Sequence, residues 1–362
     1  MNPIQAILAE RGTVTFRDFM ELALYHPEHG YYGGGHAELG RGGDFFTNVS
    51  VGVIFGELLA WQFREMWERL GRPGRFTIIE QGAHDGTFAA DVLAWCRAEA
   101  PDFFEALQYE IVEGLPALRQ RQGKRLEGYP VTWSNALEEV APFAGVHFSN
   151  ELIDAFPVHL VRFRDGNWRE LCVTPELQWA EQTADSLASA LEYIPRVEGY
   201  TTEISLAAPR WAAALAPKIE RGWALAVDYG FPRARYYAPE RKQGTLQCYA
   251  RHTKGLDPLG EPGSRDLTAH VDFTTVTEAF LAAGMDLAGY TDQHHFLTGL
   301  VARIFAEHAP TAQQTRGLKT LLHPEMLGTS FQVLGVSRGI PPGPPLAGFQ
   351  YARDAGSALG VG

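Results

Sequence analysis

The sequence has few cysteines, and they are far apart. Cys96, Cys172 and Cys248 are the three cysteines among 362 residues, and no two of them form a Cys-x-x-Cys pair. This spacing argues against a disulfide framework and against a cysteine zinc site. The histidines include the neighbours His294 and His295 but show no His-Glu-x-x-His spacing, so we expect no metal site.

The N-terminal residues lack the features of exported proteins. They show no basic region followed by an apolar stretch and a small-residue cleavage site, and no arginine-rich transit segment. No apolar run along the chain reaches the length of a transmembrane helix. Together with the isolated cysteines, these features predict a reduced protein in the cytoplasm without a membrane span.

The chain has fewer positively charged than negatively charged residues. The chain has 31 Lys and Arg against 43 Asp and Glu, which gives a formal net charge of −12. An acidic chain repels nucleic-acid phosphates, so a nucleic-acid partner is not expected. A basic protein segment or a cationic small molecule is compatible with this charge. The hydrophobic share of 45% is sufficient for a large core, and the composition is also compatible with a homo-oligomer.

Short apolar runs alternate with helical patterns in the first half of the chain. Four runs are expected as buried strands, at residues 76–82, 107–114, 131–135 and 145–151. Helices are expected at 87–99, 115–126 and 201–219. Further apolar runs that would extend the sheet lie at 222–230, 286–291 and 331–338. Alternation of this kind predicts an α/β fold with a doubly wound sheet.

The predicted domain organisation has three parts. Residues 1–72 are expected to form an N-terminal helical cap with a glycine-rich lid loop, and residues 73–340 the α/β domain. Insertions are expected near 156–200, where an Asp-Gly turn indicates an antiparallel hairpin, and near 231–265, a long loop. Residues 341–362 form a Pro/Gly-rich tail, for which we expect no regular structure.

The segment EQGAHDG, residues 80–86, links the first expected strand to a helix. Glycines at such a turn let the main chain approach a ligand closely. Dinucleotide-binding turns carry G-x-G-x-x-G, and this spacing is missing here. S-adenosylmethionine has no phosphate and instead needs a strand-end acid, a glycine turn and a second acid for its ribose hydroxyls. Glu113 ends the second strand and suits that last role, because a carboxylate can accept both hydroxyl hydrogen bonds.

The hypothesis of an S-adenosylmethionine site names six residues. They are Glu80, Gly82, His84, Gly86, Glu113 and, beside the adenine edge, Asn135. The alternative interpretation is that Gly82 and Gly86 only shape a tight turn, and that Asn135 only forms a turn after its strand.

Several segments, in the same order along the chain, resemble the MidA-like methyltransferases. This family includes a mitochondrial complex I assembly factor that acts as a protein arginine methyltransferase. The segments are FRDFMELALYHPEHGYYGGG (16–35), GDFFTNVSVGVIFGELLAWQ (43–62), the turn at 80–86, SNELIDAFPVHL (149–160), VDYG (227–230), GTLQCYARH (244–252) and PGSRDLTAHVDFTTV (262–276). At the position of His84 the family usually carries a glycine. The resemblance implies a Rossmann-like methyltransferase fold, S-adenosylmethionine as methyl donor and an arginine acceptor.

Methyl transfer from a sulfonium is an in-line displacement, so the protein must mainly align the acceptor and exclude water. A guanidinium acceptor needs carboxylates to orient it. Asn150, Glu151 and Asp154 follow the fourth strand, and Asp228 ends a later one, so all four are expected at the strand ends where ligands bind. His270 is a candidate general base. The alternatives are a helix-start acid for Glu151, a surface carboxylate for Asp154 and an ordinary hydrogen-bonded histidine for His270.

The sequence therefore predicts an S-adenosylmethionine-dependent methyltransferase that acts on an arginine of a protein acceptor. One alternative is a small-molecule O- or N-methyltransferase on the same scaffold. Another is a non-catalytic assembly or binding protein that keeps the fold, since a fold alone does not determine a function.

Overall fold

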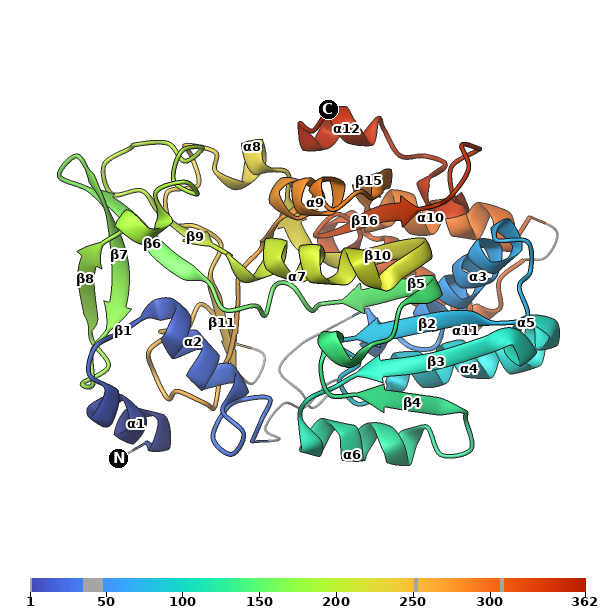
Figure 1. The fold of residues 1–362 in the computed structure, drawn as a ribbon, viewed down its shortest axis with the longest axis horizontal. Coiled ribbons are helices and arrows are strands. Elements are labelled where there is room, and N and C mark those ends of the chain that lie inside the picture. The colour runs from blue at the N-terminus through green and yellow to red at the C-terminus, as the bar shows by residue number, and fades with distance from the viewer. Residues whose placement is uncertain (1, 35–47, 251–252, 307–308) are drawn as a thin grey trace. The chain divides into compact units, whose positions relative to one another are not determined.

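The computed structural model describes residues 2–34, 48–250, 253–306 and 309–362 (Figure 1). The chain divides into two compact units, and each is assembled from three separate segments. Unit 1 contains residues 1–45, 153–209 and 231–272, whereas unit 2 contains residues 46–152, 210–230 and 273–362. Most of the expected lid loop falls on residues 35–47, which lie outside the described part of the chain.

Unit 2 contains a mixed sheet whose strands follow the order β15-β16-β10-β5-β2-β3-β4. Their bounds are β2 Phe76–Gln81, β3 Leu107–Val112, β4 Val131–Ser134, β5 Phe143–Asn150, β10 Ile219–Phe231, β15 Asp286–Asp292 and β16 Phe331–Arg338. The strands from β10 to β4 are parallel, and β16 pairs antiparallel with both β10 and β15. The predicted doubly wound α/β sheet is confirmed.

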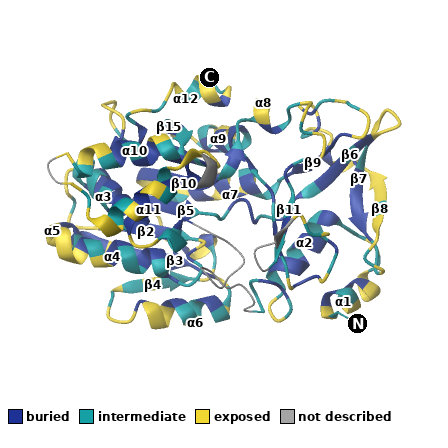
Figure 2. Ribbon diagram, turned by 180° about the vertical axis from the view of Figure 1, so that it is seen from behind, coloured by how far each residue is buried: buried dark blue, intermediate teal, exposed yellow. Residues whose placement is uncertain are grey.

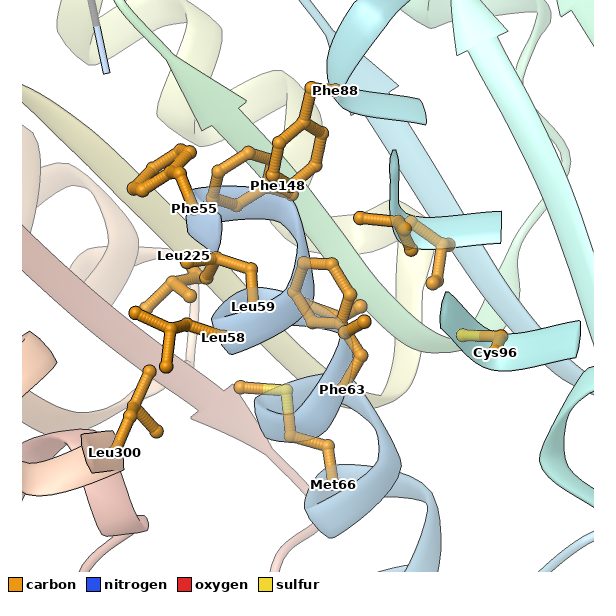
Figure 3. Close-up of a cluster of buried hydrophobic side chains, with 14 of the residues drawn as sticks. Phe55, Leu58, Leu59, Phe63, Met66, Phe88, Cys96, Phe148, Leu225 and Leu300 are labelled. Carbon is orange, nitrogen blue, oxygen red and sulfur yellow. The ribbon is translucent and has the colours of Figure 1, made fainter. Parts of the chain in front are cut away.

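Helices cover both faces of this sheet. One face carries α3, α4, α10 and α11, with bounds Ile54–Arg69, Thr87–Glu99, Gln293–Ile304 and Ala312–Leu322. Figure 3 shows α3 placing Phe55, Leu59 and Phe63 against side chains of the neighbouring helix and strands. In that cluster Phe88 of α4 stacks on Phe148 of β5 at a centroid distance of 4.5 Å. Such aromatic pairs add about 0.5–1.5 kcal/mol to the free energy of burial.

The opposite face of the sheet is covered by α7, Ala207–Leu215, and α9, Phe273–Ala282. Because side chains alternate along a strand, His147 points away from Phe148 and meets Trp211 of α7 edge-on. Trp211 in turn packs on Phe280 of α9. The other α-helices of unit 2 are α5 Pro101–Ala106, α6 Pro116–Arg125 and α12 Ala355–Leu359. Burial on both faces explains why the central strands are continuous apolar runs (Figure 2).

Unit 1 is built on antiparallel strands. Its larger sheet has the order β1-β7-β6-β9, with β8 paired to β7; the bounds are β1 Val14–Thr15, β6 His159–Arg164, β7 Asn167–Val173, β8 Trp179–Thr183 and β9 Thr201–Ile204. A smaller sheet contains β11 Gln247–Ala250, β12 Thr253–Lys254 and β13 Asp266–Thr268. Unit 1 also contains α1 Pro3–Arg11, α2 Phe16–Tyr25, α8 Arg233–Tyr236 and β14 Val271–Asp272. The N-terminal helices share a core with β6, β7 and β13.

Some elements differ from the sequence-based expectation. Residues 201–219 are not one helix, because Thr201–Ile204 is a buried strand and α7 begins only at Ala207. The long loop near 231–265 contains α8 and β11. Residues 341–362 are more ordered than a plain tail, since they contain α12 and place Leu346 and Phe349 in the core. The expected boundary between residues 72 and 73 also differs from the observed one. Helix α3 belongs to unit 2, which begins at Phe46, rather than to an N-terminal cap.

Candidate active site

The strand order of unit 2 places two chain turns side by side. From β2 the chain continues to β3 and β4 on one side, whereas β5 and β10 lie on the other side, so the order reverses between β2 and β5. The turn after β2 therefore meets the turn after β5. A Cβ atom on Gly82 would lie 3.3 Å from Cβ of Leu152 and 3.7 Å from the carbonyl oxygen of Asn150. In open α/β sheets this reversal point is where ligands bind.

The glycine turn has three residues in the left-handed region. Gly82 has φ +84°, His84 +45° and Gly86 +82°, and the amide of Gly86 donates to the carbonyl of Ala83 at 2.8 Å. The Asp85 carboxylate accepts from both the amide and the hydroxyl of Thr87, which fixes the start of α4. Glycine adopts such φ values without steric cost, whereas a residue with a Cβ atom is destabilised by them.

His84 is the one residue with a side chain among these three left-handed positions. Both of its ring nitrogens are buried, and neither has a hydrogen-bond partner within the described part of the chain. Its Nδ1 lies 4.0 Å from an oxygen of Asp85, which is too far for a hydrogen bond. A buried ring nitrogen without a partner is costly, and a polar ligand held in the turn would provide the missing partner.

Glu113 follows β3 and is almost fully buried. Its carboxylate accepts from the Leu115 amide at 2.8 Å and from Nε2 of Gln122 at 3.0 Å. The same Nε2 donates to the carbonyl of His84 at 2.9 Å, so one glutamine connects Glu113 to the glycine turn. Burial raises the pKa of Glu113, and these hydrogen bonds act against that rise. The carboxylate retains lone pairs for further donors such as ribose hydroxyls.

Glu80 and Asn135 have other protein partners. Glu80 is buried beside Tyr109, whose hydroxyl donates to it at 2.7 Å, and burial raises the pKa of Glu80 to about 8. Asn135 is exposed, and its side chain bonds Arg119 and Glu139. Its carbonyl oxygen nevertheless lies close to Gly114, directly after Glu113. Both side chains can be explained by structural roles, and their contact with a cofactor stays a prediction.

A second polar group lies at the ends of β5 and β10, also in unit 2. Asn150 donates to the Glu151 carboxylate at 2.9 Å, and Glu151 has φ +52°, a strained value for a residue with a side chain. The carboxylate of Asp228 accepts from the amides of Leu152 and Tyr229, at 3.1 and 2.9 Å. The structure thus brings Asn150, Glu151 and Asp228 to one edge of the sheet, as the sequence predicted from their positions.

The sequence interpretation missed Asn48. Its Nδ2 donates to Oδ1 of Asn150 at 3.0 Å, and it is completely buried. Its own Oδ1 has no hydrogen-bond partner among the described residues. Asn48 stands inside one of the segments that carry the family resemblance, and this was the signal available in the sequence.

Asp154 and His270 belong to unit 1. The Ala269 amide donates to the carbonyl of Asp154, so the two candidates lie in neighbouring stretches of chain. The ring of His270 packs on Phe231, and its main-chain amide donates to the hydroxyl of Thr245. Burial and, second, the charge of Arg241 lower the pKa of His270 to about 4. His270 is therefore neutral at pH 7 and a weaker base than an exposed histidine.

In residues 2–34, 48–250, 253–306 and 309–362, none of the helices is long and apolar enough to cross a membrane. No group of three or more His, Cys, Asp or Glu side chains is arranged there to hold a metal ion.

Known proteins match nearly the whole chain. Residues 58–291 match the family described as "Putative S-adenosyl-L-methionine-dependent methyltransferase". A crystal structure from Burkholderia thailandensis with S-adenosyl-homocysteine bound superimposes with a TM-score of 0.88 at 32% identity, over 98% of this chain and 96% of the other. A second, native crystal structure from this organism has a TM-score of 0.85 at 31% identity, over 98% of this chain and 96% of the other.

Curated relatives extend the comparison. The chain is 28% identical to "Protein arginine methyltransferase NDUFAF7 homolog, mitochondrial" of Drosophila melanogaster, over 93% of this chain and 84% of the relative. It is 26% identical to "Protein arginine methyltransferase NDUFAF7, mitochondrial" of Homo sapiens, over 95% of this chain and 83% of the relative. Both relatives are named as mitochondrial, and this corrects the cytoplasmic location expected from the cysteines and the N-terminal residues.

Proposed function

The chain belongs to this family of S-adenosyl-L-methionine-dependent methyltransferases, and on that premise we propose that it methylates an arginine side chain of a protein. The match to curated protein arginine methyltransferases, 28% identical over 93% of this chain, carries the proposal. The predicted Rossmann-like methyltransferase fold and the predicted cofactor are both confirmed by the matches. The acceptor is the part that we propose.

We assign the cofactor to the turn after β2 and to the end of β3. When bound, S-adenosylmethionine supplies an electrophilic methyl group on a sulfonium. Gly82 and Gly86 let the main chain adopt the left-handed turn that would hold the ligand, and the ring nitrogens of His84 offer it hydrogen bonds. Glu113 is held in place by Leu115 and Gln122 and would accept from hydroxyl donors. The side chains of Asn135 and Glu80 complete the proposed set.

We assign the acceptor to the ends of β5 and β10. A guanidinium is planar and cationic, so carboxylates fix both its orientation and its charge. Glu151 is the best candidate, because Asn150 orients its carboxylate and its main chain is held by Val227. Asp228 adds negative charge at the same edge, while its two amide bonds keep it in one orientation. For Asp154 and His270, which lie in unit 1, a part in the reaction stays a prediction.

The test uses cofactor labelled in its methyl group, incubated with the protein and a cell lysate. After separation of proteins, the labelled band is hydrolysed and its amino acids are identified. Methylarginine is the expected product, and the Glu113→Ala variant should give little of it. Label that appears only in small molecules would contradict the protein acceptor, and label on another residue type would contradict arginine.

A further inference from the structure

A cavity of about 590 Å³ in unit 1 is lined by positively charged side chains. Its wall is a single stretch of chain that begins in α8, and the lining residues are Ala234, Arg235, Ala238, Glu240, Arg241, Lys242, Gln243 and Gly244. The cavity is open to solvent, because Arg235, Glu240 and Lys242 in its lining are exposed, and its volume lies in the range of small-molecule sites. The lining has three cations and one carboxylate, so it carries an excess of two positive charges in a chain whose net charge is −12.

Among the described residues, no carboxylate forms an ion pair with the cations of this basic cavity, which are Arg235, Arg241 and Lys242. Instead, the guanidinium groups of Arg235 and Arg241 both lie over the ring of Phe231, at 5.1 and 4.3 Å from its centroid. Two like charges at one ring repel each other, and a bound anion nearby would reduce that repulsion.

The wall of the basic cavity is held rigidly by a buried carboxylate. Glu203 of β9 accepts from the amides of Thr245 and Leu246 and from the hydroxyl of Tyr236. Gly244 has φ +67° and packs so closely that a Cβ atom there would lie 2.2 Å from an oxygen of Glu203.

A further main-chain bond fixes the same wall, since the Thr201 amide donates to the carbonyl of Lys242 at 2.9 Å. The chain that carries Arg241 and Lys242 is therefore preorganised before any ligand arrives, which lowers the entropic cost of binding.

We propose that this basic cavity binds a small molecule bearing a doubly charged oxyanion group, either a phosphate or a pair of carboxylates. Arginine suits such a ligand because its planar fork makes two parallel hydrogen bonds to an oxyanion. The excess of two positive charges matches a ligand with two negative charges. None of the lining residues belongs to the methyl-transfer assignment, although Phe231, which Arg235 and Arg241 contact, also packs on His270.

Calorimetry at low ionic strength tests the proposal with two probes, inorganic pyrophosphate and succinate. We expect binding of at least one probe, and a loss of about tenfold to a hundredfold in affinity for Arg235→Gln and Arg241→Gln. Arg164→Gln is the matched control, because Arg164 is an exposed arginine of the same unit paired with Asp165 and Glu181. Pyrophosphate binding alone would identify a phosphate ligand, and succinate binding alone a dicarboxylate.

Thermal unfolding checks that each variant is folded. If Arg241→Gln fails this check, Lys242→Gln replaces it, since Lys242 is exposed and its side chain makes no hydrogen bond in the described structure. Absence of binding by both probes would overturn the proposal, as would undiminished affinity in the variants or an equal loss in Arg164→Gln. Binding of poly-glutamate without binding of either probe would also overturn it, in favour of an acidic protein partner.

Discussion

At the scale of single residues, Glu113 offers a direct test of the cofactor site. Its two observed hydrogen bonds come from groups that position it, so the remaining lone pairs are available to a ligand. Glu113→Ala should weaken S-adenosylmethionine binding by about 1.5–3 kcal/mol, the usual scale for hydrogen bonds to a charged group. Calorimetry measures this, with the exposed Glu138→Ala as control. Equal affinities of the wild type and Glu113→Ala would contradict the assignment.

Variants of Glu151 and His270 distinguish a guanidinium acceptor from a hydroxyl acceptor. If Glu151 orients a guanidinium, Glu151→Gln should keep the cofactor Kd but lower kcat at least about tenfold, because it removes charge with little change in shape. His270→Ala should matter less, since a histidine with a pKa of about 4 is a weak base at neutral pH. Steady-state kinetics on a protein acceptor measure both. The reverse ranking would favour a hydroxyl acceptor that needs a base.

Glu80 should make stability depend on pH. Its pKa is about 8 in the folded protein and near 4.5 when unfolded, so between these values the folded state binds more protons. Its contribution to stability is complete below pH 4.5 and is lost as pH rises towards 8, at up to about 1.4 kcal/mol per pH unit. Glu80→Gln should therefore gain stability relative to the wild type from pH 5 to pH 8. Urea unfolding at several pH values measures this, and parallel curves would rule it out.

At the scale of elements, the turn between β2 and α4 can be tested against a matched glycine. Gly82 and Gly128 have nearly the same φ, +84° and +85°, but only Gly82 has neighbours within 4 Å of an added Cβ. Both alanine variants should lose about 1–2 kcal/mol of stability through the left-handed φ. Only Gly82→Ala should weaken cofactor binding, about tenfold or more. Equal affinity of the two variants would mean that the turn is merely structural.

The sequence predicted those elements whose signals are local. Thr87–Glu99 is the helix expected from the turn and its apolar pattern, and β2 to β5 are the strands expected from their apolar runs. Residues 201–204 were wrongly expected to be helical. The partners of Glu203 there are amides about 42 residues later, and no pattern near Glu203 reveals them. For the same reason the hydrogen bond from Asn48 to Asn150, 102 residues away, could not be predicted from the sequence pattern near Asn48.

At the scale of the whole molecule, residues near the C-terminus close the core of unit 2. Phe349 is buried against Phe296 and lies over two strand glycines, where a Cβ on Gly289 would be 2.3 Å from its ring. Phe349→Ala should cost about 3–5 kcal/mol of unfolding free energy. Tyr351→Ala is the control and should change little, because Tyr351 is 51% exposed. Chemical denaturation compares them, and a small effect of Phe349→Ala would show that the segment is not anchored.

The sequence did not show which segments of the chain combine into each of the two units. The apolar pattern identified 156–200 and 231–265 as departures from the α/β repeat, but not that they share a core with α1 and α2. Phe19 and Leu171 share that core although they are far apart in the chain. Side-chain periodicity shows that a face is buried, but it does not show which distant face covers it.

Because unit 1 is assembled from three separate segments of the chain, the ribosome synthesises its parts at different times. The first segment of unit 1 is made early, but its last segment ends only at residue 272. At about 5–20 residues per second, α1 and α2 wait on the order of tens of seconds for the strands that cover their apolar faces. During this time the nascent chain exposes Phe16, Phe19 and Met20, which are fully buried in the finished protein. The N-terminal helices should therefore be a binding site for chaperones that act during translation.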